Sequence, residues 1–96
     1  MNMTQELSSK RSQIEQIAAR HGAFNIRVFG SVVRGEATPE SDIDILVDTK
    51  PRTSSWFPAG LILDLQELLG RRVEVVTQKG LNPLIRDHVL KEAIPL

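Results

Sequence analysis

The fold of this chain is decided by two neighbouring stretches, GSVVRGE at residues 30–36 and SDIDILV at residues 41–47. The second stretch is an apolar run that carries aspartates at alternate positions, Asp42 and Asp44, beginning eleven residues after Ser31. Alternate residues of a β-strand point to the same face of a sheet. The two carboxylates are therefore predicted to lie side by side, next to a glycine–serine turn.

That turn has the composition of a phosphate-binding loop. Gly30 lets the backbone turn tightly and approach a ligand closely. Ser31 begins a short predicted helix, and its hydroxyl can either bind phosphate or cap the helix; the two roles are compatible. Arg34, one turn later, can reach the phosphates or pair with Glu36 or Glu40 on the surface. We expect Gly30, Ser31 and Arg34 to bind a nucleotide.

The paired aspartates suit a divalent cation. Asp42 and Asp44 supply the hard oxygen ligands that Mg²⁺ prefers. A third carboxylate is expected from a neighbouring strand, and Glu74 stands alone among the valines of residues 73–76. A charge in such a strand needs a partner, a metal or an open face. Asp42, Asp44 and Glu74 are thus the predicted metal and catalytic residues, the alternative being solvated carboxylates without a ligand.

Periodicity and turn residues predict four helices and three strands in the order α-β-α-β-α-β-α. The helices are expected at 4–20, 31–35, 59–69 and 83–93, and the strands at 25–29, 42–47 and 72–77. Residues 49–58 are rich in Pro, Ser and Thr and are expected to form an exposed connection. The fold class is α/β (α+β), a small mixed sheet flanked by helices, in a single domain spanning residues 1–96.

Composition limits the function classes. The 96 residues carry twelve basic and twelve acidic side chains, so no strong positive field attracts nucleic acid, and direct nucleic-acid binding is disfavoured. The chain has no cysteine, which excludes disulfides and thiolate metal sites. No signal-peptide core and no apolar run near the roughly 20 residues of a membrane span is found. We expect a cytoplasmic protein without membrane contact.

The roles of two pairs of residues remain open at this point. Trp56 and Phe57 lie in the polar connection, where they can cover an edge of the core, the reading we favour, or form an exposed anchor for a partner. His21 and His88 have no metal-ligand spacing and are expected at the surface. A homo- or hetero-oligomer is possible, because apolar residues of the 59–69 helix can serve a dimer as readily as a core.

Taken together, residues 30–36 and 41–47 resemble the minimal nucleotidyltransferases (MNT) of the DNA polymerase beta superfamily. The family pattern is Gly-Ser, then Asp-x-Asp in an apolar strand, then an acid in a later strand, here RRVEVVT at residues 71–77. The closing helix of the family corresponds to LIRDHVLKEA at residues 84–93. The resemblance covers nearly the whole chain and implies a polymerase-beta-like nucleotidyltransferase fold.

The resemblance implies transfer of a nucleoside monophosphate from a nucleoside triphosphate, expected here to be AMP from ATP, to a hydroxyl, with release of pyrophosphate. Ser31 would contact the triphosphate, Asp42 and Asp44 would bind two Mg²⁺ ions, and Glu74 would complete the acidic set. The third acid of the family is more commonly aspartate. A glutamate moves the carboxylate by roughly 1.5 Å, and a misplacement of about 1 Å can cost a hundredfold in rate.

Small members of the family resemble the antitoxins of HEPN/MNT toxin–antitoxin modules. By that analogy the acceptor is a partner protein, a HEPN ribonuclease toxin that is silenced by adenylylation (AMPylation) of a tyrosine. Larger relatives carry a further domain that grips the acceptor, so we expect another polypeptide to supply that surface here. The alternatives are an antitoxin that neutralises its partner by direct binding with little catalysis, and a small-molecule nucleotidyltransferase of the aminoglycoside type.

Overall fold

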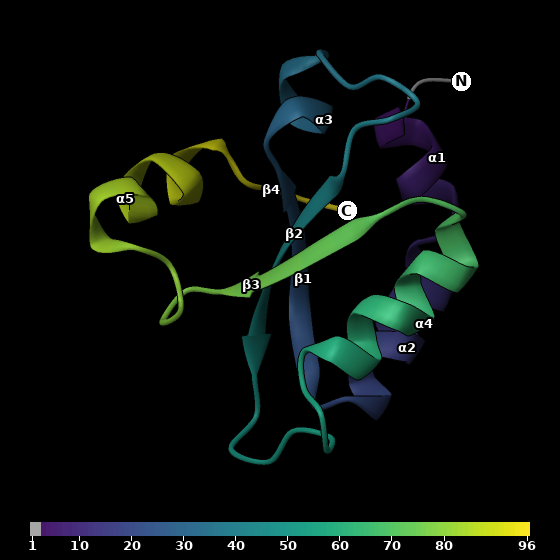
Figure 1. Ribbon diagram of the computed structural model, residues 1–96, viewed down its shortest axis with the longest axis vertical. Coiled ribbons are helices and arrows are strands. Elements are labelled where there is room, and N and C mark those ends of the chain that lie inside the picture. The colour runs from purple at the N-terminus through teal and green to yellow at the C-terminus, as the bar shows by residue number, and fades with distance from the viewer. Residues whose placement is uncertain (1–2) are drawn as a thin grey trace.

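The computed structural model describes residues 3–96 and consists of a four-stranded mixed sheet with helices on both faces (Figure 1). The helices are α1 (Met3–Ser9), α2 (Arg11–Arg20), α3 (Ser31–Arg34), α4 (Ala59–Leu69) and α5 (Pro83–Glu92). The strands are β1 (Ala23–Phe29), β2 (Ile43–Thr49), β3 (Val73–Thr77) and β4 (Ile94–Pro95). The predicted fold class and the predicted succession of helices and strands are confirmed, with one helix divided and one short strand added.

The strand order across the sheet is β3-β2-β1-β4. The central strand β2 pairs in parallel with β3 and antiparallel with β1, and β4 pairs antiparallel with the other side of β1. The parallel connection from β2 to β3 runs through α4, the usual way to return a chain to a parallel neighbour. β2 therefore lies inside the sheet, and both of its edges are paired.

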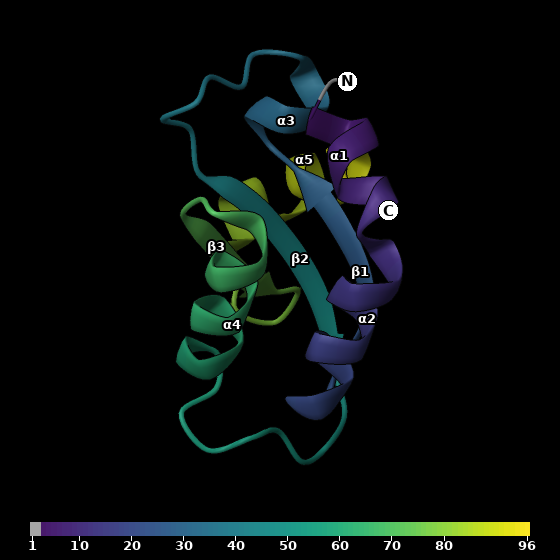
Figure 2. The same ribbon diagram turned by 90° about the vertical axis from the view of Figure 1, so that its right-hand side faces the viewer.

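The main core lies on the face of the sheet covered by α2 and α4, which face the viewer in Figure 2. Ile43, Ile45 and Val47 of β2 point into it and are at most 1% exposed. They pack with buried residues of the two helices such as Ile14 and Leu61. This alternation along β2 turns the intervening residues of the strand, at positions 44, 46 and 48, to the opposite face.

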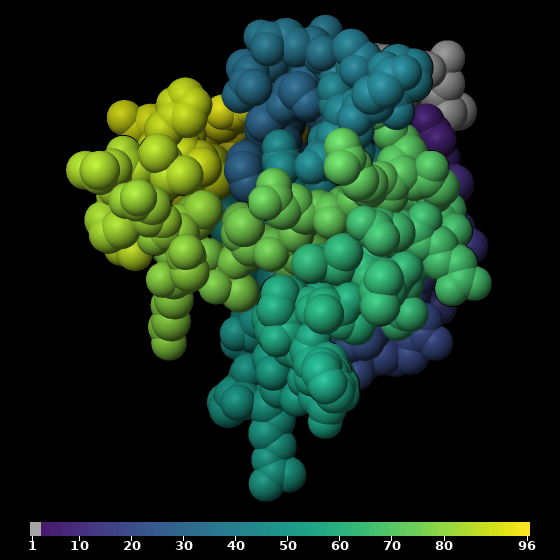
Figure 3. Space-filling view, in the orientation of Figure 1, coloured from purple at the N-terminus to yellow at the C-terminus, as the bar shows by residue number. Residues whose placement is uncertain are grey.

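A second, smaller core lies on that opposite face. Leu46 is fully buried there against Leu81 and Val89, which come from the segment before α5 and from α5 itself. In the space-filling view this segment and α5 stand out as a lobe beside the body of the domain (Figure 3). α5 thus covers the middle of this face and leaves its upper end, at the start of β2, to the polar residues described below.

The predicted helix 4–20 is wrong as one element, because it divides into α1 and α2 at Lys10. Ser9 precedes the division, and its hydroxyl donates to the Glu6 carbonyl at 2.7 Å. Serines compete in this way for helix hydrogen bonds and favour helix ends. Leu7 and Ile14, one on each helix, are both fully buried.

His21 is not a surface residue, contrary to the prediction. Its side chain is 14% exposed, and its ring nitrogens lie 2.6 Å from Ser54 Oγ and 2.7 Å from Asp64 Oδ2. These bonds connect the end of α2 to the loop before α4 and to α4 itself. The His21 ring therefore ties together segments that are more than thirty residues apart in the chain. His88, in contrast, is exposed, as predicted.

The aromatic pair is divided between the two interpretations. Phe57 is partly buried and packs on the main core, as the favoured interpretation requires. Trp56 is 85% exposed, so the same interpretation is wrong for this ring.

None of the helices within residues 3–96 has the length and apolar character that a membrane-spanning helix needs.

The small core under α5 supplies the first testable prediction. Leu46→Ala removes most of a fully buried side chain from a cluster with few members, and should destabilise the protein by about 3 kcal/mol. Leu63→Ala, at a position of α4 that is 63% exposed, should change stability by less than about 0.5 kcal/mol. Urea denaturation of both variants measures the difference, and equal losses would contradict the described packing.

Candidate active site

The candidate site begins at the turn that ends β1. Gly30 has φ 79°, in the left-handed region that favours glycine. A Cβ at this position would overlap the carboxylate of Asp44. The glycine therefore allows the turn to pass directly over β2, and it brings Ser31, the first residue of α3, close to the aspartate.

Asp44 and Glu74 are neighbours across the parallel pair of strands. Asp44 is in register with Glu74, just as Ile43 is with Val73. Parallel pairing in register points both side chains to the same face, the one that carries α5. Asp44 is partly buried, and Glu74 is exposed. The structure thus places the predicted third carboxylate beside the second one.

The pKa of Asp44 is raised from its ordinary value of 3.8 to about 6. Burial is the largest cause, followed by a side-chain hydrogen bond with Glu74 and by the negative charges of Glu74 and Asp42, against a smaller opposing effect of Arg34. Two carboxylates can share a hydrogen bond only if one of them is protonated. The pair therefore holds a proton at a pH where isolated aspartates have lost theirs.

Asp42 lies two residues before Asp44, just outside the start of β2. Its Oδ1 is 3.1 Å from Nε of Arg72. The same oxygen is sheltered from solvent and accepts no hydrogen bond from the residues that the structure describes. A carboxylate oxygen in this condition is incompletely satisfied. Asp42 contributes charge to the site, as its effect on Asp44 shows, while its closest cationic contact is an arginine.

These carboxylates fit a divalent cation without forming a closed cage. Within residues 3–96, no three His, Asp or Glu side chains are already arranged to hold one ion. The unsatisfied Asp42 oxygen and the shared proton of Asp44 and Glu74 are both conditions that a hard cation relieves. Mg²⁺ is commonly held by one or two carboxylates together with substrate phosphates and water, so an open set of this kind is suitable.

Arg34 is held by two carboxylates. Its Nη1 donates to Glu92 Oε1 at 2.7 Å, and its Nε lies 3.4 Å from Glu36 Oε2. These contacts raise the pKa of its guanidinium further. The predicted surface pair with Glu36 is therefore present, and Glu92 is a second partner that sequence reasoning missed.

A signal for Glu92 exists in the sequence. Glu92 is the last residue of α5, where the helix dipole disfavours a negative charge. An acid in that position needs compensation, and here it receives it from Arg34, from the Gly30 N–H at 2.9 Å and from His88 at 3.0 Å. The pattern indicates that a partner exists, but not which residues provide it.

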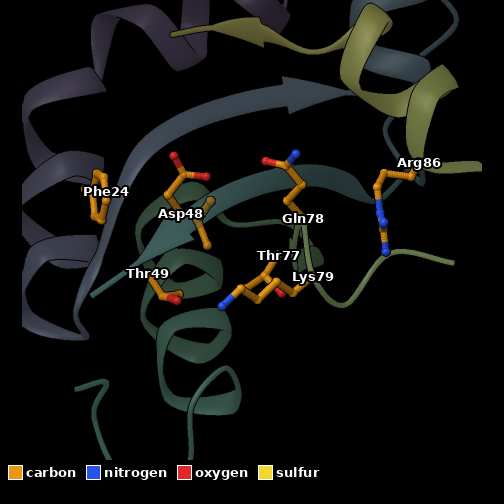
Figure 4. Close-up of a pocket in the computed structure, with 8 residues that line it drawn as sticks. Phe24, Asp48, Thr49, Thr77, Gln78, Lys79 and Arg86 are labelled. Carbon is orange, nitrogen blue, oxygen red and sulfur yellow. The ribbon is translucent and has the colours of Figure 1, made fainter. Parts of the chain in front are cut away.

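A separate pocket of about 630 Å³ lies further along the sheet (Figure 4). It is formed where β2 and β3 end, and Asp48, Thr77, Lys79 and Arg86 are among its lining residues. Asp48 lies four residues after Asp44, about 13 Å along the strand. Its carboxylate is already bonded to Arg27 at 2.7 Å and to Asn25 at 2.9 Å. The pocket includes none of the three predicted metal ligands.

The fold, with its glycine–serine turn over the central strand, is that of a minimal nucleotidyltransferase. The chain belongs to the nucleotidyltransferase domain family, whose model matches residues 10–96, and it is an enzyme of that class. A solved structure described provisionally as a minimal nucleotidyltransferase is 46% identical, with a TM-score of 0.85, and the match covers 100% of this chain and 97% of the other.

Curated relatives extend this similarity. The protein adenylyltransferase MntA of Thermococcus cleftensis is 41% identical, over 83% of this chain and 81% of the relative. A protein of Methanocaldococcus jannaschii, provisionally named a protein adenylyltransferase, is 37% identical over 88% of this chain and 90% of its own length. A crystal structure of a toxin–antitoxin with AMP-PNP shares the fold at 21% identity, with a TM-score of 0.73 over 91% of this chain and 69% of the other.

The raised pKa of Asp44 predicts a pH-dependent effect of Asp44→Asn in the metal-free protein. The folded state holds the proton more tightly than the unfolded state, so stability from this group is lost as pH rises from about 4 to about 6. The full shift corresponds to about 3 kcal/mol, but water screens this partly exposed carboxylate, and we expect about 1 kcal/mol. In EDTA at pH 7.5, Asp44→Asn should therefore melt about 4–8 °C above wild type.

The same comparison at pH 4 should show a much smaller difference, because Asp44 is then protonated in the folded state and only partly ionised in the unfolded state. Asp87→Asn, at an exposed carboxylate of α5, is the matched control and should not reproduce the gain at pH 7.5. Scanning calorimetry at the two pH values measures both effects. A lower melting temperature for Asp44→Asn at pH 7.5 would contradict the description of the acidic pair.

Proposed function

We propose that this nucleotidyltransferase transfers AMP from ATP to a hydroxyl of a partner protein, with Mg²⁺ as cofactor. The observation that carries the proposal is the Asp44–Glu74 pair, in register on one face of the sheet and directly under the Gly30 turn. The names of two relatives, at 41% and 37% identity, support a protein as the acceptor. The six candidate residues, namely Gly30, Ser31, Arg34, Asp42, Asp44 and Glu74, take the roles that follow.

In the proposed reaction the acceptor oxygen forms a bond to the α-phosphorus of ATP, the bond between the α- and β-phosphates breaks, and pyrophosphate leaves. Ser31 binds the phosphates through its hydroxyl, and Gly30 allows their close approach. Arg34 lies one turn away and adds positive charge. One carboxylate of the acidic set accepts the proton of the acceptor hydroxyl.

Asp42, Asp44 and Glu74 would hold Mg²⁺, which when bound supplies positive charge to the attacking and leaving oxygens. For Asp42 this requires release from Arg72, whose side chain is 79% exposed and free to move into solvent. An exposed ion pair of this kind contributes little stability, so its release is inexpensive. Glu74 lies on the neighbouring strand in register with Asp44, close enough for both carboxylates to bind the same Mg²⁺ ion.

We propose further that the partner is a HEPN-type ribonuclease toxin and that this chain is its antitoxin. The family resemblance of residues 30–36 and 41–47 suggests this pairing. The shared fold with the toxin–antitoxin crystal structure is consistent with it. Adenylylation of the toxin would then be the means of silencing.

A second candidate function is neutralisation by direct binding with little catalysis. One observation favours it: Asp42 is paired with Arg72, and the three carboxylates do not yet surround a common point in residues 3–96. The two functions differ in what the carboxylates must do. Only the transfer reaction needs them, whereas occlusion needs only a surface.

Transfer is tested with ATP labelled at the α-phosphate. Wild-type protein with Mg²⁺ should label one protein in a lysate of its own host, and the labelled protein can be identified by mass spectrometry. The double variant Asp42→Asn/Asp44→Asn should give no label, because it removes two of the predicted ligands. EDTA should also abolish the wild-type signal, because it removes the Mg²⁺ that these ligands would hold.

The same double variant separates the two candidate functions. If transfer silences the toxin, the variant should still bind the toxin but fail to restore growth of cells that express it. Full restoration of growth by a variant that transfers no label would overturn the catalytic proposal and support occlusion.

The role of Glu74 is tested by substitution with its amide. Glu74→Gln keeps the size of the side chain but removes the charge, and should lower kcat about 100-fold or more, because a misplaced or missing ligand costs at least that much. Glu40→Gln, in the exposed loop before β2, is the control and should leave kcat within twofold. Similar rates for wild type and Glu74→Gln would exclude Glu74 from the acidic set.

A further inference from the structure

Glu92 is a largely enclosed carboxylate beside the Gly30 turn and has no role in the chemistry proposed above. Its side chain is 11% exposed. Oε1 accepts from the Gly30 N–H at 2.9 Å and from Arg34 Nη1 at 2.7 Å, and Oε2 lies 3.0 Å from His88 Nε2. One carboxylate at the end of α5 thus holds both the backbone and the arginine of the nucleotide turn.

This position is unfavourable unless those donors are present. A nearly buried carboxylate loses hydration, and the carboxyl end of a helix adds an unfavourable dipole. Hydrogen bonds from Arg34 and from a backbone N–H to an ionised group are short and strong, and they compensate the loss. The same bonds commit the Gly30 N–H and one nitrogen of Arg34 to the protein itself.

Glu92 is carried on a well-anchored element. Val89, one turn earlier in α5, is 5% exposed in the core above Leu46. Immediately after Glu92 the chain forms β4, where Ile94 pairs with Val28 of β1. The carboxylate is therefore fixed on both sides along the chain, so its contacts hold the turn against the sheet.

We infer that Glu92 is a positioning residue for nucleotidyl transfer. Gly30 contacts Glu92 through its N–H and lies against the carboxylate of Asp44 through its Cα. Glu92 thereby sets the position of the Ser31 turn relative to Asp44, and it fixes the direction of Arg34. This inference rests on the proposed function, since it takes the turn to be the place where the phosphates of ATP bind.

The test compares Glu92→Gln with Glu36→Gln. Both substitutions remove an acidic partner of Arg34, but Glu36 is 63% exposed and has no contact with the Gly30 N–H in the structure. Glu92→Gln should raise KM for ATP about 10-fold and lower kcat/KM about 100-fold, the size expected for weakened charged hydrogen bonds and a displaced turn. Glu36→Gln should leave both within twofold.

The division between KM and kcat separates positioning from stability. A variant that is merely less folded has a lower kcat in proportion to its folded fraction and an unchanged KM. A normal KM for Glu92→Gln would therefore overturn the inference. So would tighter binding of AMP-PNP than in wild type, because Glu92 would then be a competitor of the phosphates.

A second measurement needs no nucleotide. In the ¹⁵N-labelled wild-type protein the Gly30 amide should resonate downfield and exchange slowly, and in Glu92→Ala, which removes the acceptor oxygen that glutamine would keep, it should shift upfield and exchange at least 10-fold faster. An unchanged Gly30 amide would overturn the contact itself. If wild type neither binds AMP-PNP nor transfers AMP, the proposed function fails, and this amide result still decides whether Glu92 holds the turn.

Discussion

The parallel pairing of β2 with β3 is the constraint on which the candidate site depends. It places Asp44 in register with Glu74, so that two carboxylates share one face and one hydrogen bond. Burial of Asp44 beside Glu74 and Asp42 disfavours its charged form and raises its pKa, with burial as the largest cause and the hydrogen bond and negative charges of its neighbours as smaller ones. Buried residues of β2 nevertheless anchor the strand in the core. The unfavourable negative charge of the Asp44–Glu74 pair is reduced when a proton or a cation binds there.

The two faces of the sheet differ in what they contain: one holds the main core, and the other carries the acidic residues. One face is covered by α2 and α4, and it holds the main core. The other is covered only in its middle, where α5 buries Leu46, and its polar end carries the acidic residues. A small domain can bury only a limited core, so stability concentrated on one face leaves the second face for a ligand. The enzyme class follows from the family to which the chain belongs.

α5 connects the two functions, because the helix that completes the second core also carries Glu92. Through Glu92 the helix reaches the Gly30 turn, and through Gly30 it reaches Asp44. The exposed outer residues of the same helix include Leu84, which is 91% exposed. The packing of α5 and the geometry of the Gly30 turn are therefore parts of one arrangement, not independent features of the fold.

The sequence by itself determined what depends on neighbours along the chain. Alternation along residues 42–47 predicted that Asp42 and Asp44 share one face, and the glycine–serine pair predicted the turn, because side-chain direction and backbone freedom are local properties. Only the tertiary structure decided contacts between distant segments. The Gly30–Glu92 bond joins residues 62 positions apart, and the bonds of His21 to Ser54 and Asp64 likewise span the fold. Such contacts depend on how the elements pack, which no local pattern encodes, and β4 was missed because two residues acquire a strand conformation only from the edge of β1 beside them.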